Sequence, residues 1–212
     1  VPDECPAGFR NTYGDLDVYG PEVQATFQDM IQNDVAMTST LVVYEISVAD
    51  RPPIHERVYD ILAPEIAEEV REIAIARRAG QGAIDPEAFS RAMEYERAFV
   101  QAGGTLAAGV DPTGYGAAPP GFGDQRNYEL LLEAGFSVPE VVQIMSANGA
   151  KVLGVLDNVG TVEQGKLADL VVIEGDLEES GNLHNTKIVF RHGLGWDSSK
   201  LIESVRGIVG IR

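Results

Sequence analysis

One carboxylate in this sequence, that of Asp111, occupies a position where proteins often carry out chemistry. Residues 105–110 have the composition of a short buried strand that ends on Asp111. In proteins with parallel sheets, ligands and catalytic groups gather at the carboxyl ends of the strands. Gly109 leaves room there for a close approach of backbone or ligand. The alternative is that Asp111, which precedes Pro112, only opens an Asx-type turn, and position alone favours neither interpretation.

The other residues with metal-binding or phosphate-binding chemistry form no local motif. His55, His184 and His192 are not spaced as a zinc motif requires, and we expect each at the surface. Residues 160–166 match the start of a phosphate-binding loop, but Leu167 stands where a Ser or Thr hydroxyl must bind magnesium. The segment also leads into a predicted strand and not into a helix, so we interpret the match as a coincidence.

The elements that must position Asp111 alternate between helix and strand, which predicts a parallel α/β sheet. Residues 35–44 are rich in β-branched residues without strict alternation, which is typical of a strand buried on both faces. Apolar residues at helical spacing, with Pro, Asp or Ser at the starts and Gly at the ends, predict the surrounding helices. These helices cover residues 21–33, 63–79, 85–102, 124–134 and 137–153.

The pattern changes near Asp157 to short β-rich runs separated by Gly and Asn turns. Strands are predicted over residues 159–162, 168–173 and 187–191, and His192-Gly193 has the composition of a hairpin tip. These strands form an antiparallel unit that is too small to close a sandwich by itself.

The 212-residue chain contains 33 acidic and 16 basic residues, a net charge of −17. This acid excess disfavours nucleic acid and anionic membranes as partners, because both require basic surfaces. With 44% hydrophobic residues and no apolar run long enough for a bilayer, we expect a soluble globular protein. The single cysteine excludes a disulfide scaffold, and we favour the cytoplasm over the periplasm or secretion. The sequence starts at Val1 without a signal peptide, and we expect it to begin inside a longer precursor.

Four segments resemble the carboxyl-terminal part of the amidohydrolase superfamily, especially the imidazolonepropionase-like amidohydrolases. In chain order they are AGVDPTG (108–114), ELLLEAGFS (129–137), SANGAKVLG (146–154) and GTVEQGKLADLVVI (160–173). The fourth segment is highly characteristic of the family, and weaker similarity extends back to about Val18. One departure is Val110, where family members usually have Thr or Ser.

The resemblance implies an α/β fold, namely the carboxyl-terminal part of a metal-dependent hydrolase (β/α)8 barrel plus part of a small β-sandwich. Residues 1–155 would contain the seventh barrel strand at 35–44 and the eighth at 105–110. Residues 156–212 would form the carboxyl-terminal strands of the sandwich. The family's metal site uses an H-x-H pair, a Lys, two further His and an Asp ending the eighth strand, which Asp111 matches.

The sequence contains no H-x-H pair, so the resemblance implies that most metal ligands lie upstream of Val1. The chain would then be a fragment that is completed by the remainder of its own barrel or by a complementary chain. We expect these 212 residues alone to be inactive and to retain metal weakly.

The activity that the resemblance implies is hydrolysis of a C–N bond in a small molecule, such as an amide, a dipeptide or a cyclic amide, by metal-activated water. The cofactor would be one or two divalent metal ions, with zinc favoured, and Asp111 would serve as a ligand and as the catalytic proton acceptor. Tyr115 and Arg126 are candidate substrate contacts, since an arginine can pair with a substrate carboxylate.

Two alternative functions remain open at this point. The first is a non-catalytic fragment or subunit that docks onto a partner supplying the rest of the barrel. The second is a deaminase of the same superfamily, because the same attack on carbon serves both reactions. A homo-oligomer also remains open.

Overall fold

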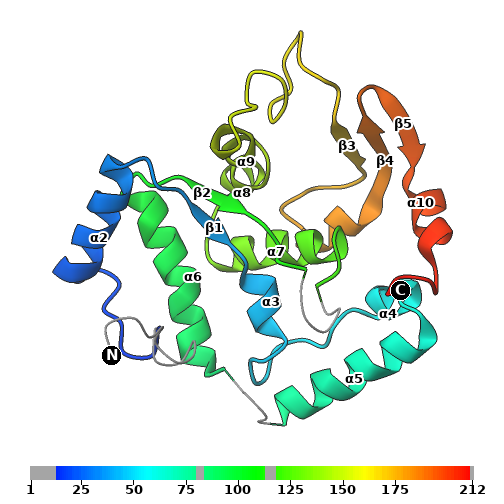
Figure 1. Ribbon diagram of the computed structural model, residues 1–212, viewed down its shortest axis with the longest axis horizontal. Coiled ribbons are helices and arrows are strands. Elements are labelled where there is room, and N and C mark those ends of the chain that lie inside the picture. Colours follow the sequence, from blue (N-terminus) through cyan, green and yellow to red (C-terminus); the bar gives the residue numbers. More distant parts are fainter. Residues whose placement is uncertain (1–12, 80–83, 113–117, 211–212) are drawn as a thin grey trace.

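The computed structural model describes residues 13–79, 84–112 and 118–210 (Figure 1). The elements up to the second strand are α2 (Pro21–Gln32), β1 (Met37–Ser39), α3 (Leu41–Glu45), α4 (Glu56–Ile61), α5 (Pro64–Arg78), α6 (Pro86–Gln101) and β2 (Leu106–Ala108). The elements after it are α7 (Phe122–Glu133), α8 (Val138–Met145), α9 (Ala147–Val152), β3 (Leu170–Ile173), η1 (Ser180–Asn185), β4 (Thr186–Arg191), β5 (Leu194–Asp197) and α10 (Ser198–Val205).

Strands β1 and β2 form a parallel pair, with Met37 opposite Leu106 and Ser39 opposite Ala108. The chain between them returns through α6, which runs beside the pair (Figure 1). Parallel neighbours need such a crossover, so the predicted parallel α/β arrangement is confirmed. β2 also lies within the strand predicted over residues 105–110.

The strand predicted over residues 35–44 is wrong in its second half, which forms the short helix α3. The pairing of β1 with β2 ends at Ser39. Beyond this residue the amide of Val43 donates to the carbonyl of Thr40 at 3.2 Å, in a helical turn. Leu41 and Val42 are then buried against α6 and α7. The β-branched composition of this run therefore reflects burial, and tertiary packing decides its backbone conformation.

The helices predicted over residues 21–33, 63–79 and 85–102 are confirmed as α2, α5 and α6. A proline begins each of these helices, where its missing N–H costs no hydrogen bond and its fixed φ suits the first turn. The carboxylate of Asp85 also caps α6 by accepting the amide N–H of Glu87 at 2.8 Å.

The helix predicted over residues 124–134 is confirmed as α7, whereas the one predicted over 137–153 is divided into α8 and α9. The predicted capping box is present at the start of α8, where the amide of Ser137 donates to the carboxylate of Glu140 at 2.7 Å. Ser146 leaves the helical conformation, with a ψ of −81°, and thereby separates the two helices.

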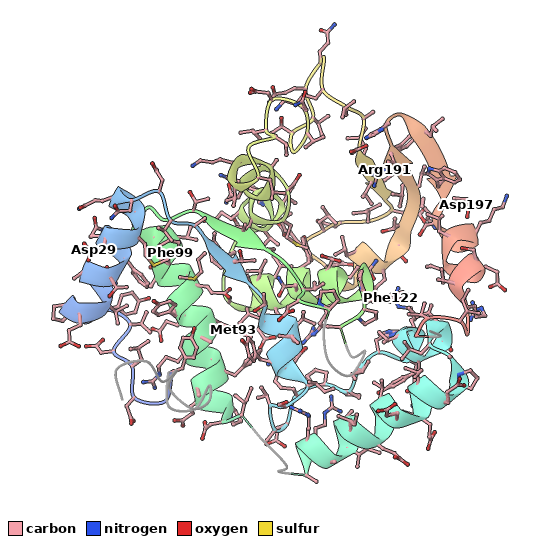
Figure 2. The ribbon with its side chains drawn as sticks, viewed as in Figure 1. Asp29, Met93, Phe99, Phe122, Arg191 and Asp197 are labelled. Atoms are coloured by element: carbon pink, nitrogen blue, oxygen red, sulfur yellow. The ribbon has the colours of Figure 1, made fainter. Side chains whose placement is uncertain are left out.

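Helix α6 connects the clusters of the hydrophobic core. Phe89 and Met93 are buried beside α3 and α7, whereas Phe99, near the other end of α6, packs on Phe27 of α2 with 5.3 Å between ring centroids (Figure 2). The apolar stripe of α6 therefore packs on α3 and α7 near one end and on α2 near the other.

Strands β3, β4 and β5 form an antiparallel sheet in that order, and β3 and β4 confirm the strands predicted over 168–173 and 187–191. His192 and Gly193 form the predicted hairpin tip, with φ of 50° and 80°, as a tight two-residue turn requires. The short elements β5, α10 and α4 were not predicted.

The strand predicted over residues 159–162 is wrong, because this segment folds back on itself and joins no sheet. Gly160 has a φ of 96°, in the left-handed region, which interrupts an extended path. The amide of Leu167 then donates to the carbonyl of Asn158 at 2.9 Å and closes a loop.

The chain after α10 returns to α4 (Figure 1). The amide of Val209 donates to the carbonyl of Ile61 at 3.0 Å, and the amide of Ala63 donates to the carbonyl of Val209 at 2.9 Å. These bonds link the α4–α5 region to the end of the described chain. Within the described ranges, no helix combines the length and the hydropathy that a membrane span would need.

Candidate functional site

Asp111 lies just beyond the carboxyl end of β2, and its side chain is exposed. Its φ of 44° is in the left-handed region that non-glycine residues rarely adopt, and it precedes Pro112. Such a conformation costs roughly 1–3 kcal/mol and is found preferentially at functional sites. Asp34 and Asp50 also have a positive φ at exposed turns, so the backbone alone does not identify a site.

Packing on both sides of β2 holds the chain that leads to Asp111. Leu106 and Ala108 pack with the cluster formed by α7 and α8, and Val110 is buried in the cluster that joins α3, α6 and α7. On the opposite face of the strand pair, Thr38 is exposed and its partner Ala107 is buried. Val110 thus anchors the chain in the core, and Asp111 follows it with a left-handed φ and an exposed side chain.

A metal ion would need more ligands than this surface offers. The described residues contain no group of three or more His, Cys, Asp or Glu that could hold a metal ion. Zinc takes at least three protein ligands, so Asp111 can contribute one ligand but does not make a metal site with the other described residues. The alternative Asx turn would use the amide of residue 113, which lies outside the described residues.

Of the two predicted substrate contacts, Tyr115 lies outside the described residues. Arg126 lies on α7, and all three of its guanidinium nitrogens are engaged by carboxylates. Its Nε and Nη2 donate to Glu45 at 2.8 and 2.6 Å, and its Nη1 donates to Glu129. A substrate carboxylate would have to compete with these two partners for Arg126.

Glu45 links Arg126 to a second arginine. Its Oε1 accepts the Nε–H of Arg51 at 2.9 Å, and Arg51 also forms a bidentate pair with Glu133. Burial opposes the charge of Arg126, but its carboxylate partners raise its pKa above the usual value. The hydrogen bond with Arg51 likewise holds the pKa of Glu133 below its usual value. This charge network ties α3 and the loop after it to α7.

A cavity of about 160 Å³, which we call the α3–α7 cavity, lies beside this network. Its wall is formed by Val42, Glu45, Ile46, Pro52, Pro53, Ile54, His55, Arg57, Val58, Arg78, Phe122, Gly123, Arg126, Glu129 and His184. Phe122 lies at the start of α7 beside α4, and the guanidinium of Arg57 is 5.4 Å from the centroid of its ring (Figure 2).

Two histidines that are far apart in the sequence meet at this cavity. The ring centroids of His55 and His184 are 5.5 Å apart in an edge-to-face arrangement. Nε2 of His184 lies 3.0 Å from Oε1 of Glu129. Burial and the positive charge of Arg57 nevertheless lower the pKa of His184, so this imidazole is neutral at pH 7.

The α3–α7 cavity is the feature that the sequence did not predict. The expectation of surface histidines is confirmed for His55 and His192, which are exposed, but wrong for His184, which is half-buried. No local pattern could have revealed the cavity, because its residues come from α3, α4, α5, α7 and η1 and meet only in the folded chain.

A second unpredicted feature is the buried carboxyl group of Glu96 on α6. This side chain is 8% exposed, and its Oε2 has no hydrogen-bond partner. Burial raises the pKa of Glu96 to about 7, and Ser39 at the end of β1 opposes the rise. Glu96 is thus buried between α6 and the end of β1, whereas the side chain of Asp111 is exposed.

Comparison with known proteins finds a family model that matches part of this chain. The family described as Amidohydrolase family matches residues 105–194, which include Asp111 and strands β2 to β4. This confirms the resemblance to the amidohydrolase superfamily. No curated protein matches the sequence closely enough to count as a relative.

Solved amidohydrolase structures share the fold at low sequence identity. Bottromycin amidohydrolase has a TM-score of 0.57 and 18% identity over 89% of this chain and 44% of its own. A Xaa-Pro dipeptidase with bound methionine in the active site has a TM-score of 0.54 and 19% identity, over 86% of this chain and 39% of its own. An amidohydrolase from Thermotoga maritima MSB8 has a TM-score of 0.51 and 16% identity, over 84% and 35%.

The chain therefore spans less than half the length of these structures. Its α/β architecture corresponds to part of the amidohydrolase barrel fold, as the sequence predicted. At these identities the similarity concerns the fold.

Proposed function

We propose that this chain, in which residues 105–194 match the amidohydrolases, is the carboxyl-terminal part of an enzyme that hydrolyses C–N bonds. The substrate would be an amide, a dipeptide or a cyclic amide. The observation that carries the proposal is the position of Asp111, an exposed carboxylate at the carboxyl edge of a parallel strand pair.

In this proposal Asp111 moves protons during hydrolysis. Its carboxylate would accept a proton from the attacking water and then deliver this proton to the leaving nitrogen, which is general base and general acid catalysis by one group. The exposure of its side chain supports this role, because water and substrate can reach it.

Metal dependence is part of the proposal, with zinc as the favoured ion. A bound divalent ion would lower the pKa of its water and so supply hydroxide at neutral pH. Asp111 would provide one ligand, and the other ligands would come from outside the described residues, on the remainder of the barrel or on a complementary chain.

We also propose the division expected from the sequence. Residues 1–155 would carry the seventh and eighth barrel strands, and residues 156–212 would form the carboxyl-terminal strands of a β-sandwich. Two strands cannot close a barrel that needs eight, so the outer edges of the β1–β2 pair would be covered by the further strands of the barrel.

A second candidate function is a non-catalytic subunit that docks onto a partner chain. The observation that favours it is the exposed apolar surface of the antiparallel sheet, where the exposed fractions of Val171, Leu194 and Trp196 are 56%, 66% and 51%. Such residues mark an interaction surface when they are contiguous. Co-purification with a chain that bears an H-x-H pair would support this function.

The proposed hydrolase is tested on the longest natural protein that contains this chain. We expect it to release free amine from a panel of N-acyl amino acids and dipeptides, to lose this activity on treatment with a chelator, and to regain it with Zn²⁺. Hydrolysis that is indifferent to the chelator would contradict the metal-dependent part. No release of amine from any substrate by the zinc-loaded protein would contradict the proposed function.

A further inference from the structure

The α3–α7 cavity contains more positive charge than its carboxylates neutralise. Glu45 already pairs with Arg51 and Arg126, and Glu129 already pairs with Arg126 and His184. Both carboxylates of the wall are therefore engaged, and the remaining two arginines of the wall determine its net charge.

Arg57 and Arg78 have only neutral acceptors among the described residues. Nη2 of Arg57 donates to Oε1 of Gln125 at 2.9 Å, and Nη2 of Arg78 donates to the carbonyl of Pro52. Nε of each arginine is buried without a hydrogen-bond partner. Outside the described ranges, the only acidic residues are Asp3 and Glu4, so few carboxylates remain that could neutralise this pair.

Among the described residues, Arg57 and Arg78 therefore line one cavity without a carboxylate hydrogen-bonded to either of them, although Glu129 acts on Arg57 from a greater distance, in a chain of net charge −17. A buried cation loses hydration, and this cost is recovered only by a counter-charge or by strong acceptors. The lowered pKa of His184 also indicates positive charge at this cavity. Burial and the charge of Arg57 lower its pKa even though Glu129 lies 3.0 Å away.

We propose that the α3–α7 cavity binds a small oxyanion, a carboxylate or a phosphate, between the guanidinium groups of Arg57 and Arg78. Guanidinium N–H groups match the oxygens of both anions and form charge-assisted hydrogen bonds with them. A volume of about 160 Å³ holds one small ion or a few waters. Pro52, Pro53 and His55 are exposed at the wall and leave the cavity open to solvent.

The ligand is recognised without any contribution from Asp111, which does not line this cavity. Nδ1 of His55 accepts the amide N–H of Arg57 at 3.2 Å, which leaves Nε2 of the same ring as a further donor. The apolar walls of Val42, Ile46 and Val58 lower the local dielectric and strengthen each of these contacts.

The test is titration of the 212-residue chain with inorganic phosphate and, separately, with acetate, followed by calorimetry and by the NMR signals of His184. We expect saturable binding of at least one anion, and the anion that binds more tightly identifies the ligand chemistry. Arg57→Gln and Arg78→Gln should each weaken binding about tenfold or more, the effect of losing a charge-assisted hydrogen bond. Arg71→Gln is the matched control on α5, because Arg71 pairs with Glu56 away from the cavity, and binding should not change.

The position of the anion is checked separately from its affinity. A bound anion favours protonated imidazole, so the measured pKa of His184 should rise when the ligand is added. Arg57→Lys, which keeps the charge, should bind better than Arg57→Gln, and circular dichroism shows whether each variant is folded. The proposal is overturned if neither anion saturates, if folded Arg57→Gln and Arg78→Gln bind like the parent chain, or if the pKa of His184 does not move.

Discussion

Asp111 is held at the carboxyl edge of the strand pair by neighbours that have other contacts. Val110 is buried among core residues, and Gly109 packs so closely that a Cβ there would lie 3.3 Å from Cγ2 of Thr38. The backbone next to Asp111 is thus fixed by packing, while its carboxylate stays exposed. A side chain supported in this way can serve in chemistry without carrying the stability of the fold.

Glu96 offers a test of buried charge at the level of one residue. Burial raises its pKa in the folded chain from 4.5 to about 7, so the folded state holds a proton that the unfolded state releases. The stability that this provides is complete below pH 4.5 and is lost as the pH rises to about 7. Glu96→Gln should therefore stabilise the chain at pH 8, by at most about 3 kcal/mol.

The measurement is urea denaturation of both proteins at pH 5 and at pH 8, with Glu94→Gln as the control because Glu94 is exposed on the same helix. The gain in stability of Glu96→Gln should be larger at pH 8 than at pH 5, and Glu94→Gln should show no such difference. An equal effect of Glu96→Gln at both pH values would show that the carboxyl group keeps the same ionisation in the folded and unfolded chain.

At the level of elements, the network centred on Glu45 ties α3 to α7. Glu45 is 7% exposed and bridges Arg51 and Arg126. Glu45→Gln removes the charge between two guanidinium groups, and we expect a loss of about 3 kcal/mol in the free energy of unfolding. Each arginine keeps one carboxylate partner, so the loss belongs at the lower end of the range for buried pairs.

Glu56→Gln is the matched control, because Glu56 forms a bidentate pair with Arg71 that is exposed to solvent. Its denaturation midpoint should stay close to that of the parent chain, since exposed pairs contribute little. If Glu45→Gln were as stable as Glu56→Gln, the network would not hold α3 and α7 together.

The long helices of this fold could be predicted from the sequence because their signals are local. Proline at the first position, Asp85 at a cap and the Ser137–Glu140 box each act within one turn. The helix α3 could not be predicted in this way, since its β-branched residues fit a buried strand equally well. Its conformation depends on where the hydrogen-bonded pairing of β1 with β2 ends.

The candidate functional residues also differ in whether local sequence signals can predict them. Asp111 could be predicted because a strand, a glycine and an acid are adjacent in the sequence, and the structure places it at the strand end. The α3–α7 cavity could not, because it depends on contacts between Arg57, Arg78 and His184 that only the folded chain creates. Its role, like that of Asp111, stays a prediction until the variants are measured.

At the scale of the whole molecule, both sheets are small and leave edges or apolar side chains uncovered within the described residues. The parallel pair has two strands, and the antiparallel sheet has three strands with exposed Leu194 and Trp196. Solved amidohydrolases share this arrangement over 35–44% of their own length. Both surfaces would be covered if the proposed complementary part of the fold were present.

The same reasoning predicts how the 212 residues behave by themselves. With Asp111 as a single ligand, we expect the purified chain to retain less than one zinc ion per molecule after dialysis and to hydrolyse no amide. Zinc content by mass spectrometry and amine release measure these two properties. One tightly held zinc ion per chain would contradict the proposal that most ligands come from elsewhere.

The most direct test of the central claim is the turnover of the Asp111→Asn variant in the longest natural protein that contains this chain. Asparagine keeps the size and shape of the side chain but cannot accept the proton. We predict that amide hydrolysis falls by a factor of about a hundred or more, while the thermal unfolding midpoint stays unchanged. Hydrolysis by Asp111→Asn at the rate of the parent enzyme would remove this carboxylate from the chemistry.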